Sequence, residues 1–416
     1  MILTWQVFAA LILILLRFLA AAKLDSLNAR SVRENSDAVP GAFKGIIDEK
    51  DYFKSVRYTL EKIRYGIFES AYSSVILALI FLFGIFPILF GFFTGVFGMS
   101  VWGQALAFCL VTVIVSIPDL PLDWYEQFVL EQKFGFNKST LKLWISDKIK
   151  ETIVGLVIGV LILALILWLF GLFASTWWIW AFVAISLFQI VMLVLYPKLI
   201  LPLFNKLSPL EDGELKTALL SMADRAGFKA NSIFVIDGSK RSSHSNAFFT
   251  GFGKFRKIVL YDTLISQLTT AEIEAVLAHE IGHYKLGHVP KMIVSSFLMM
   301  FIGFAALGYL AKSEWFYEGF GFEMSEGMAP VLLLFTTLAP FVTFWLSPVF
   351  NAISRKYEYQ ADAFARKVCG TADTLVSALR KLHTKNLGNL TPHKLYSAFH
   401  YSHPTLLERQ EALRKD

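Results

Sequence analysis

Seven runs of about 20 apolar residues divide the chain, and they limit its fold more than any other feature. Each run is long enough to cross the hydrocarbon core of a bilayer as a helix. Lipid offers no hydrogen-bond partner to a free backbone amide or carbonyl, so such spans must be helical. Only 17% of the residues are charged, against about a quarter in a typical soluble domain. We therefore predict a mainly α-helical, polytopic membrane protein, with spans near residues 2–22, 70–95, 101–120, 152–173, 176–197, 289–311 and 329–350.

The basic residues between the spans predict the orientation of the chain, because Lys and Arg collect on the cytoplasmic side of membrane proteins. The connection at 23–69 carries nine of them and that at 121–151 carries five, whereas the connections on the opposite side carry only Lys312. We therefore expect the N-terminus outside and the C-terminus in the cytoplasm. The first run has no basic stretch before it and contains Arg17, so we expect a retained helix and not a cleaved signal.

The formal net charge of +6 comes mostly from the Lys and Arg residues that collect on the cytoplasmic side. It predicts the lipid bilayer, with its anionic headgroups, as a partner and gives no indication of a nucleic acid. The two cysteines, Cys109 and Cys369, imply no disulfide framework.

Two long polar stretches flank the last two spans, and we expect them to fold together against the cytoplasmic face of the membrane. The chain then divides into residues 1–198 with five spans, 199–288, 289–350 with two spans, and 351–416. Within the first polar stretch, the apolar spacing predicts a helix that is entered at Ser208 and Pro209 and ends at Gly227. Short β-rich segments predict a small sheet with strands at 232–237, 245–251 and 256–262.

The segment HEIGHYKLGH contains three of the eight histidines of the chain. Thr269 and Glu272 before it have the spacing of a capping box, and the apolar residues that follow have a helical period, so the segment is predicted on a helix. His279 and His283 then lie one turn apart on one face, as two ligands of a tetrahedral zinc require. Glu280 can take the proton of an attacking water. The pattern predicts a zinc hydrolase with one Zn²⁺ per chain.

The third ligand of the metal must come from elsewhere in the chain. The metzincin pattern places a third histidine six residues after the second, but that position is Val289. On a continuous helix His288 points away from His279, so we expect it to support the ligands, contact substrate or lie on the surface. Glu358 and Asp362, after the last span, are again four residues apart. We predict Glu358 as the third ligand and Asp362 as the carboxylate that orients a ligating imidazole.

Six segments together resemble the type I CAAX prenyl endopeptidases, which are integral-membrane zinc proteases. They are HEIGH, EYQAD, LFNKLSPLEDGELK, DGSKRSSHSNAFFTGFG, EQKFGFNKST and HPTLLER, and the similarity spans most of the chain. The resemblance implies seven helices that enclose a water-filled chamber, with a zincin-like catalytic region on the cytoplasmic side. It implies the same metal ligands, His279, His283 and Glu358, with Glu280 as general base.

The resemblance also implies residues that contact the substrate. Asn246, Ala247 and Phe248 match an edge strand that pairs with an extended peptide, a mode in which main-chain hydrogen bonds give affinity. His403 and Arg409 match a terminal motif that lies near the active site, where they could stabilise the oxyanion or support the substrate.

The substrate that the resemblance implies is a peptide or protein that ends in a prenylated CAAX motif, from which three residues are removed. The loops of this chain are short, which looks more like a bacterial relative, so we expect the bacterial inner membrane and not the endoplasmic reticulum. One alternative is a zinc endopeptidase that cuts damaged membrane proteins, although the related quality-control enzymes have fewer spans. A remote alternative is an ion transporter or channel, but the span centres are nearly free of ionisable residues, with Arg17 the clearest exception.

Overall fold

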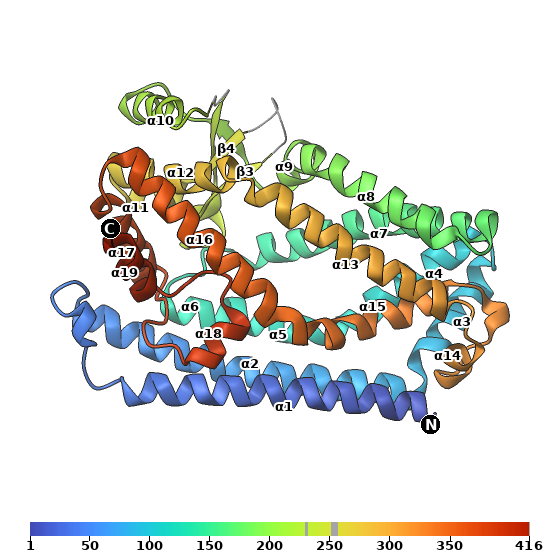
Figure 1. Cartoon of the computed structure of the whole chain (residues 1–416). Helices are drawn as coiled ribbons and strands as arrows, with labels where there is room; N and C mark the ends of the chain where they lie inside the picture. The colour runs from blue at the N-terminus through green and yellow to red at the C-terminus, as the bar shows by residue number, and fades with distance from the viewer. Residues whose placement is uncertain (229–231, 251–256, 416) are drawn as a thin grey trace.

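The computed structural model describes residues 1–228, 232–250 and 257–415. Within them, seven helical segments are long and apolar enough to cross a membrane, which confirms the predicted number. They run lengthwise through the molecule, and the N-terminus lies at the end opposite the C-terminus (Figure 1). The segments are Trp5–Glu34, Glu49–Phe83, Val101–Phe134, Leu141–Phe173, Trp177–Phe204, His288–Leu310 and Ala329–Cys369.

Three of these segments consist of several helices joined by short 3₁₀ or π-helical turns. Four of the seven are single helices: α1 (Trp5–Glu34), α2 (Glu49–Phe83), α7 (Leu141–Phe173) and α13 (His288–Leu310). The third segment contains α4 (Val101–Ser116), α5 (Leu120–Tyr125), a π-helical turn at Glu126–Glu131, and α6 (Gln132–Phe134). The fifth contains α8 (Trp177–Leu195), a π-helical turn at Tyr196–Ile200, and α9 (Leu201–Phe204). The seventh contains α15 (Ala329–Thr343) and α16 (Ser347–Cys369), joined by a short 3₁₀ turn.

The apolar run predicted as a span at 70–95 is divided at Gly84. This glycine has φ of +63°, in the left-handed region, and it ends α2 at Phe83. A separate helix, α3 (Ile85–Phe97), follows. The span itself begins at Glu49, where the Asp48 side chain accepts a hydrogen bond from the amide of Lys50. The predicted boundaries were wrong because the apolar composition continues across the glycine.

A four-stranded sheet has the order β1-β2-β4-β3. The strands are β1 (Leu207–Pro209), β2 (Ile233–Ile236), β3 (Ala247–Thr250) and β4 (Lys257–Tyr261). β1 pairs antiparallel with β2, β2 parallel with β4, and β3 antiparallel with β4. The three predicted strands are therefore present, although their ends at Gly251 and Arg256 lie outside the described residues. The predicted helix start was wrong, because Ser208 and Pro209 pair with β2 and the helix α10 begins only at Glu214.

The two polar stretches share one hydrophobic core at one end of the helices. Its buried side chains include Leu219, Ile258 and Leu277 from the first stretch, and Leu375 and Leu413 from the second. The two stretches therefore pack together as one region. Its other helices are α10 (Glu214–Arg225), α11 (Asp262–Gln267), α12 (Thr270–Lys285), α17 (Asp373–Lys385), α18 (Lys394–His400) and α19 (Leu406–Arg414), whereas α14 (Glu314–Gly319) lies at the opposite end (Figure 1).

The membrane helices leave internal space between them. A cavity of about 830 Å³ lies among α4, α7, α8, α13 and α15, and its lining is mostly apolar. Phe108, Leu163, Phe304 and Phe335 are among its lining residues. The expected water-filled chamber stays a prediction.

Candidate metal centre

The helix that carries the histidine motif begins where the sequence predicts. Thr269 is the N-cap of α12, and its side chain accepts a hydrogen bond from the amide of Glu272. Glu272 in turn accepts a hydrogen bond from the amide of Thr269, at 2.8 Å, so the capping box is complete. Lys381 and Ser377 from α17 also donate to the Glu272 carboxylate, at 2.8 and 2.6 Å. The start of α12 is thereby fixed to the second polar stretch.

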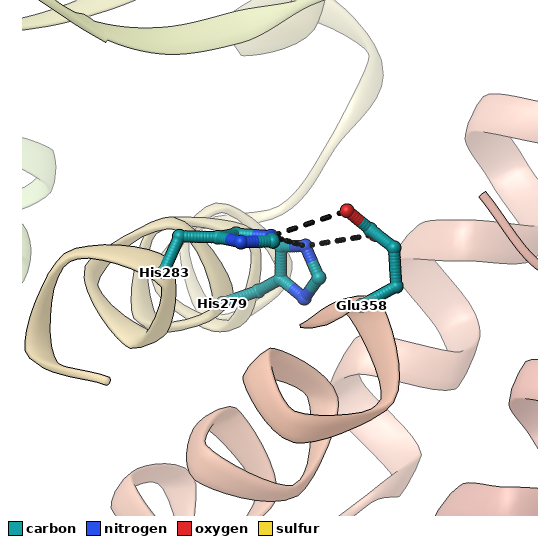
Figure 2. A group of neighbouring side chains, drawn as sticks. All are labelled: His279, His283 and Glu358. Atoms are coloured by element: carbon teal, nitrogen blue, oxygen red, sulfur yellow. Dashed lines mark hydrogen bonds and ion pairs between the residues drawn. The ribbon is translucent and has the colours of Figure 1, made fainter. Parts of the chain in front are cut away.

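Close packing of α12 against α16 brings the metal-ligand candidates together. A Cβ on Gly282 would lie 3.1 Å from the Cα of Ala361, tighter than an ordinary contact, so glycine favours this close approach of the two helices. The side chains of His279 and His283 point from α12 toward that of Glu358 on α16 (Figure 2). The two Nε2 atoms are 3.2 Å apart, and the Glu358 oxygens lie 3.4 Å from His279 Nε2 and 3.2 Å from His283 Nε2.

This arrangement fits a tetrahedral zinc ion. Ligand bonds of about 2.1 Å give ligand-to-ligand distances of roughly 3.4 Å in a tetrahedron. The three distances lie close to that value, with His279 facing Oε2 and His283 facing Oε1 of Glu358. The Glu358 Oε2 atom is buried and has no hydrogen-bond donor among the described residues, although Arg409 Nη1 lies 3.7 Å away. A buried carboxylate oxygen without a hydrogen-bond donor is costly, and a cation held beside it offsets that cost. The residues present therefore fit the metal that the motif predicts.

A chain of buried contacts stands behind the ligand candidates. The Nδ1 atom of His279 is 2.8 Å from Asp362 Oδ1, which leaves Nε2 directed toward Glu358. Arg409 from α19 donates two hydrogen bonds to Asp362, at 2.6 and 2.9 Å. Arg409 is only 8% exposed, and its guanidinium is engaged with Asp362. The terminal motif had suggested that Arg409 contacts the substrate. This geometry instead favours a role for Arg409 in holding Asp362.

Glu280 lies between the two histidines on α12 and is half-buried. Burial raises the pKa of its carboxyl above the ordinary value, and the neighbouring His279 and His283 oppose the shift. A carboxylate with a raised pKa is a better proton acceptor than an exposed one, as a general base requires.

His288 is not on the helix of His279, contrary to the assumption of one continuous helix. The chain turns at Gly287, whose φ is +68°, and His288 begins α13. Its Nδ1 atom comes within 3.1 Å of His283 Nδ1. His288 is fully buried, so it is not a surface residue.

Two residues that support His288 were missed in the sequence. Gln360 Oε1 lies 2.8 Å from His288 Nε2, and the Tyr357 ring stacks on the imidazole with 4.3 Å between centroids. Both belong to the YEYQAD segment around Glu358. Tyr357 and Gln360 are three residues apart and so share one face of α16, and this spacing was the available signal.

His403 lies on the open side of the ligand group. Its Nε2 atom is 3.4 Å from Glu358 Oε1, and 63% of its side chain is exposed. The ring can therefore face both the ligands and a bound molecule. Its Nδ1 atom is 2.9 Å from the Ser402 hydroxyl, which limits its rotation.

The predicted substrate strand lies at the edge of the sheet. Ala247 and Phe248 begin β3, whose one partner in the sheet is β4. Asn246 directly before it is exposed, and its side-chain oxygen accepts a hydrogen bond from the amide of Ala247 at 2.8 Å. β3 also contacts α12. Among the described residues, the other edge of β3 pairs with no strand, so it is available for another strand.

Two family models match the chain and together cover most of it. The first, described as the CAAX prenyl protease N-terminal region with five membrane helices, matches residues 28–206. The second, peptidase family M48, matches residues 209–416 and contains every ligand candidate.

Individual relatives agree with these family matches. CAAX prenyl protease 1 of Saccharomyces cerevisiae is 40% identical over 400 residues, which cover 90% of this chain and 88% of that protein. The CAAX prenyl protease 1 homolog of Arabidopsis thaliana is 36% identical over 412 residues, with 96% and 92% covered. The crystal structure of S. mikatae Ste24p superposes with a TM-score of 0.93 at 36% identity and covers 98% of this chain and 99% of that one. The chain therefore belongs to peptidase family M48, as a multi-pass membrane metalloendopeptidase.

Proposed function

We propose that this protein is a zinc endopeptidase that removes the last three residues of prenylated CAAX proteins. The observation that carries the proposal is the convergence of His279, His283 and Glu358 within 4.8 Å of one another, with Glu280 on the same helix turn. The relatives named as CAAX prenyl proteases support the substrate class, since they match along nine-tenths of the chain. One Zn²⁺ per chain would be held by these three side chains.

Each side chain of the centre has a separate task in peptide hydrolysis. Zinc, when bound, supplies the Lewis acidity that polarises a carbonyl and lowers the pKa of water. Glu280 accepts a proton from the attacking water and passes it to the departing amine. Asp362 Oδ1 lies 2.8 Å from His279 Nδ1. This contact holds His279 in the tautomer whose Nε2 lone pair faces the metal site. His403 is available to donate a hydrogen bond to the developing oxyanion.

The edge of β3 would bind the substrate main chain. An extended peptide that adds to this edge gains hydrogen bonds that do not depend on its side chains. Asn246, Ala247 and Phe248 would form the first part of that contact. Such binding tolerates varied sequences around the scissile bond, as variable CAAX endings require.

We further propose that the catalytic region is cytoplasmic and the N-terminus external. The nine basic residues at 23–69 and the five at 121–151 support this orientation. The three relatives reported above are eukaryotic, so they add no support to the expected bacterial inner membrane. That expectation stays a prediction.

The test is cleavage of matched peptides by the purified protein. A farnesylated CAAX peptide and its unmodified counterpart are incubated with the zinc-loaded enzyme, and mass spectrometry locates each cut. We expect one cut, three residues from the C-terminus, with the farnesylated peptide preferred. Cuts scattered along both peptides would favour the quality-control alternative. No cut in either peptide would overturn the proposed function.

A further inference from the structure

The loop that leads into β3 is held by a segment from the membrane helices. Asn137 and Ser242 form an antiparallel bridge, Lys138 donates its amide hydrogen to the carbonyl of Arg241 at 3.0 Å, and Ser243 donates to the carbonyl of Phe136 at 3.1 Å. These contacts join GFNK, which directly follows α6, to KRSS, which precedes the substrate edge. Neither segment has a role in the metal centre described above.

His244 is the side chain on which this junction is centred. Its ring stacks on Phe136 with 4.0 Å between centroids, and its Nε2 atom is 3.5 Å from Glu131 Oε2. Its Nδ1 atom is 3.2 Å from the Asn386 side-chain oxygen. The imidazole thus contacts the extension of α4 on one side and the residue after α17 on the other.

Glu131 connects His244 to the second membrane helix. Its Oε1 atom accepts hydrogen bonds from the Tyr58 hydroxyl at 2.7 Å and from Lys62 at 3.3 Å, both on α2. Glu131 is the last residue of a π-helical turn. Such turns carry an inserted residue and are frequent at functional sites. Glu131 therefore projects from the end of this irregular turn and not from a regular α-helix.

Asn386 is placed by a strained backbone position. The next residue, Leu387, has φ of +49°, which is costly for a residue with a branched side chain. It is buried in a cluster with Tyr58 and Phe136. The Asn386 side-chain oxygen accepts from the amide of Ser245 at 3.4 Å as well as facing the His244 ring. The packing of Leu387 therefore keeps Asn386 directed at the loop.

The main chain at His244 is fixed from the other face of the loop. Its carbonyl accepts a hydrogen bond from the Thr263 hydroxyl at 3.0 Å, and the Asn246 carbonyl accepts from the amide of Tyr261 at 3.1 Å. β3 begins three residues after His244. A shift of one residue in an edge strand turns every side chain to the opposite face. The contacts of His244 are therefore placed where an anchor could set the register of β3.

We propose that His244 is a positioning residue that fixes the register of the substrate-binding edge through Glu131, Phe136 and Asn386. This inference rests on the proposed peptidase function. It predicts that loss of the imidazole impairs binding and alignment of an extended peptide but leaves the metal centre intact. It also means that α2 and the extension of α4 support the substrate edge directly.

The test compares His244→Ala with His244→Gln, Asn386→Ala and the matched control Lys240→Ala, an exposed residue of the same loop. Each variant is assayed for the position of the cut, for kcat and KM separately, for zinc content, and for inhibition by acetohydroxamate, which reports on the metal alone. Peptide affinity is measured by fluorescence anisotropy in a Glu280→Gln background, so that binding is read without cleavage.

For His244→Ala we expect about a tenfold rise in KM and in peptide Kd, because register-specific main-chain hydrogen bonds are lost. A fraction of the cuts should move along the peptide, which a merely structural role would not cause. His244→Gln, which retains a donor and an acceptor, should recover part of the affinity. Asn386→Ala should weaken binding in the same direction and add little to His244→Ala, because both act through one contact. Lys240→Ala should match the wild type.

Two results would overturn the inference. One is unchanged peptide affinity and cut position in His244→Ala. The other is a parallel loss of zinc and of acetohydroxamate inhibition, because it would assign His244 to general stability. A wild-type protein that neither binds nor cuts the peptide would instead contradict the proposed function, independently of His244.

Discussion

Three carboxylates and one guanidinium meet at the centre, and their charges explain why a divalent cation fits it. Glu280, Glu358 and Asp362 together with Arg409 leave an excess of two negative charges when the histidines are neutral. Arg409 donates two hydrogen bonds to Asp362 and lies only 3.7 Å from Glu358 Oε2, which has no hydrogen-bond donor among the described residues. The excess is therefore concentrated where His279 and His283 present their nitrogens.

Glu280→Gln is expected to separate metal binding from catalysis. The substitution keeps the size of the side chain and leaves the three ligand candidates in place, but it removes the proton acceptor. We expect kcat to fall by roughly 10² to 10⁴, the usual contribution of a general base, with zinc content unchanged at one per chain by atomic absorption. Retention of full activity would exclude Glu280 as the base. If Glu280→Gln lost zinc, its lower kcat would reflect the missing metal and not the missing proton acceptor.

The contact between α12 and α16 determines whether the ligands can meet. Gly282→Ala would gain helix propensity of about 1 kcal/mol in isolation. Here its methyl group would lie 3.1 and 3.2 Å from the Cα and carbonyl oxygen of Ala361, so the helices must separate. Overpacking of this kind costs about 1–3 kcal/mol. We expect lower zinc affinity, measured by competition with a chromogenic chelator, and a lower melting temperature.

The control for this helix contact is Gly66→Ala in α2. A Cβ at Gly66 would meet no atom of the described residues within 4 Å. That variant should bind zinc as the wild type does and be equally or more stable. Equal zinc affinity in the Gly282 and Gly66 variants would contradict the importance of the close approach.

The sequence predicted those elements whose signals are local. The seven spans and the capped start of α12 follow from apolar length and from the Thr269–Glu272 spacing, and both are confirmed. The end of α2 at Gly84 was missed because the apolar composition continues across that glycine. The break at Gly287 was missed because His288 was assumed to lie on the same helix as His279. The strand at Ser208 depends on a partner strand far along the chain. The contact of Arg409 with Asp362 likewise joins helices that share no sequence pattern, so only the folded chain reveals it.

At the scale of the whole molecule, the distribution of basic residues predicts the orientation in the membrane. That orientation decides from which side a substrate can reach the metal centre. The catalytic region and the basic connection between α1 and α2 lie at one end of the helices, and α3 and α14 lie at the other (Figure 1). Moving basic residues across a bilayer is unfavourable and is opposed during insertion. The basic end, and the metal centre with it, should therefore face the cytoplasm.

Cysteine labelling tests this orientation directly. In a background that carries Cys109→Ala and Cys369→Ala, single cysteines are introduced by Asp37→Cys at the basic end and Ser325→Cys at the other end, both at exposed positions. These changes leave every Lys and Arg in place, so the charge bias is preserved. With a membrane-impermeant maleimide, intact cells should label Ser325→Cys, and Asp37→Cys should react only after the membrane is permeabilised. The reverse pattern would place the metal centre outside, where cytoplasmic prenylated substrates could not reach it.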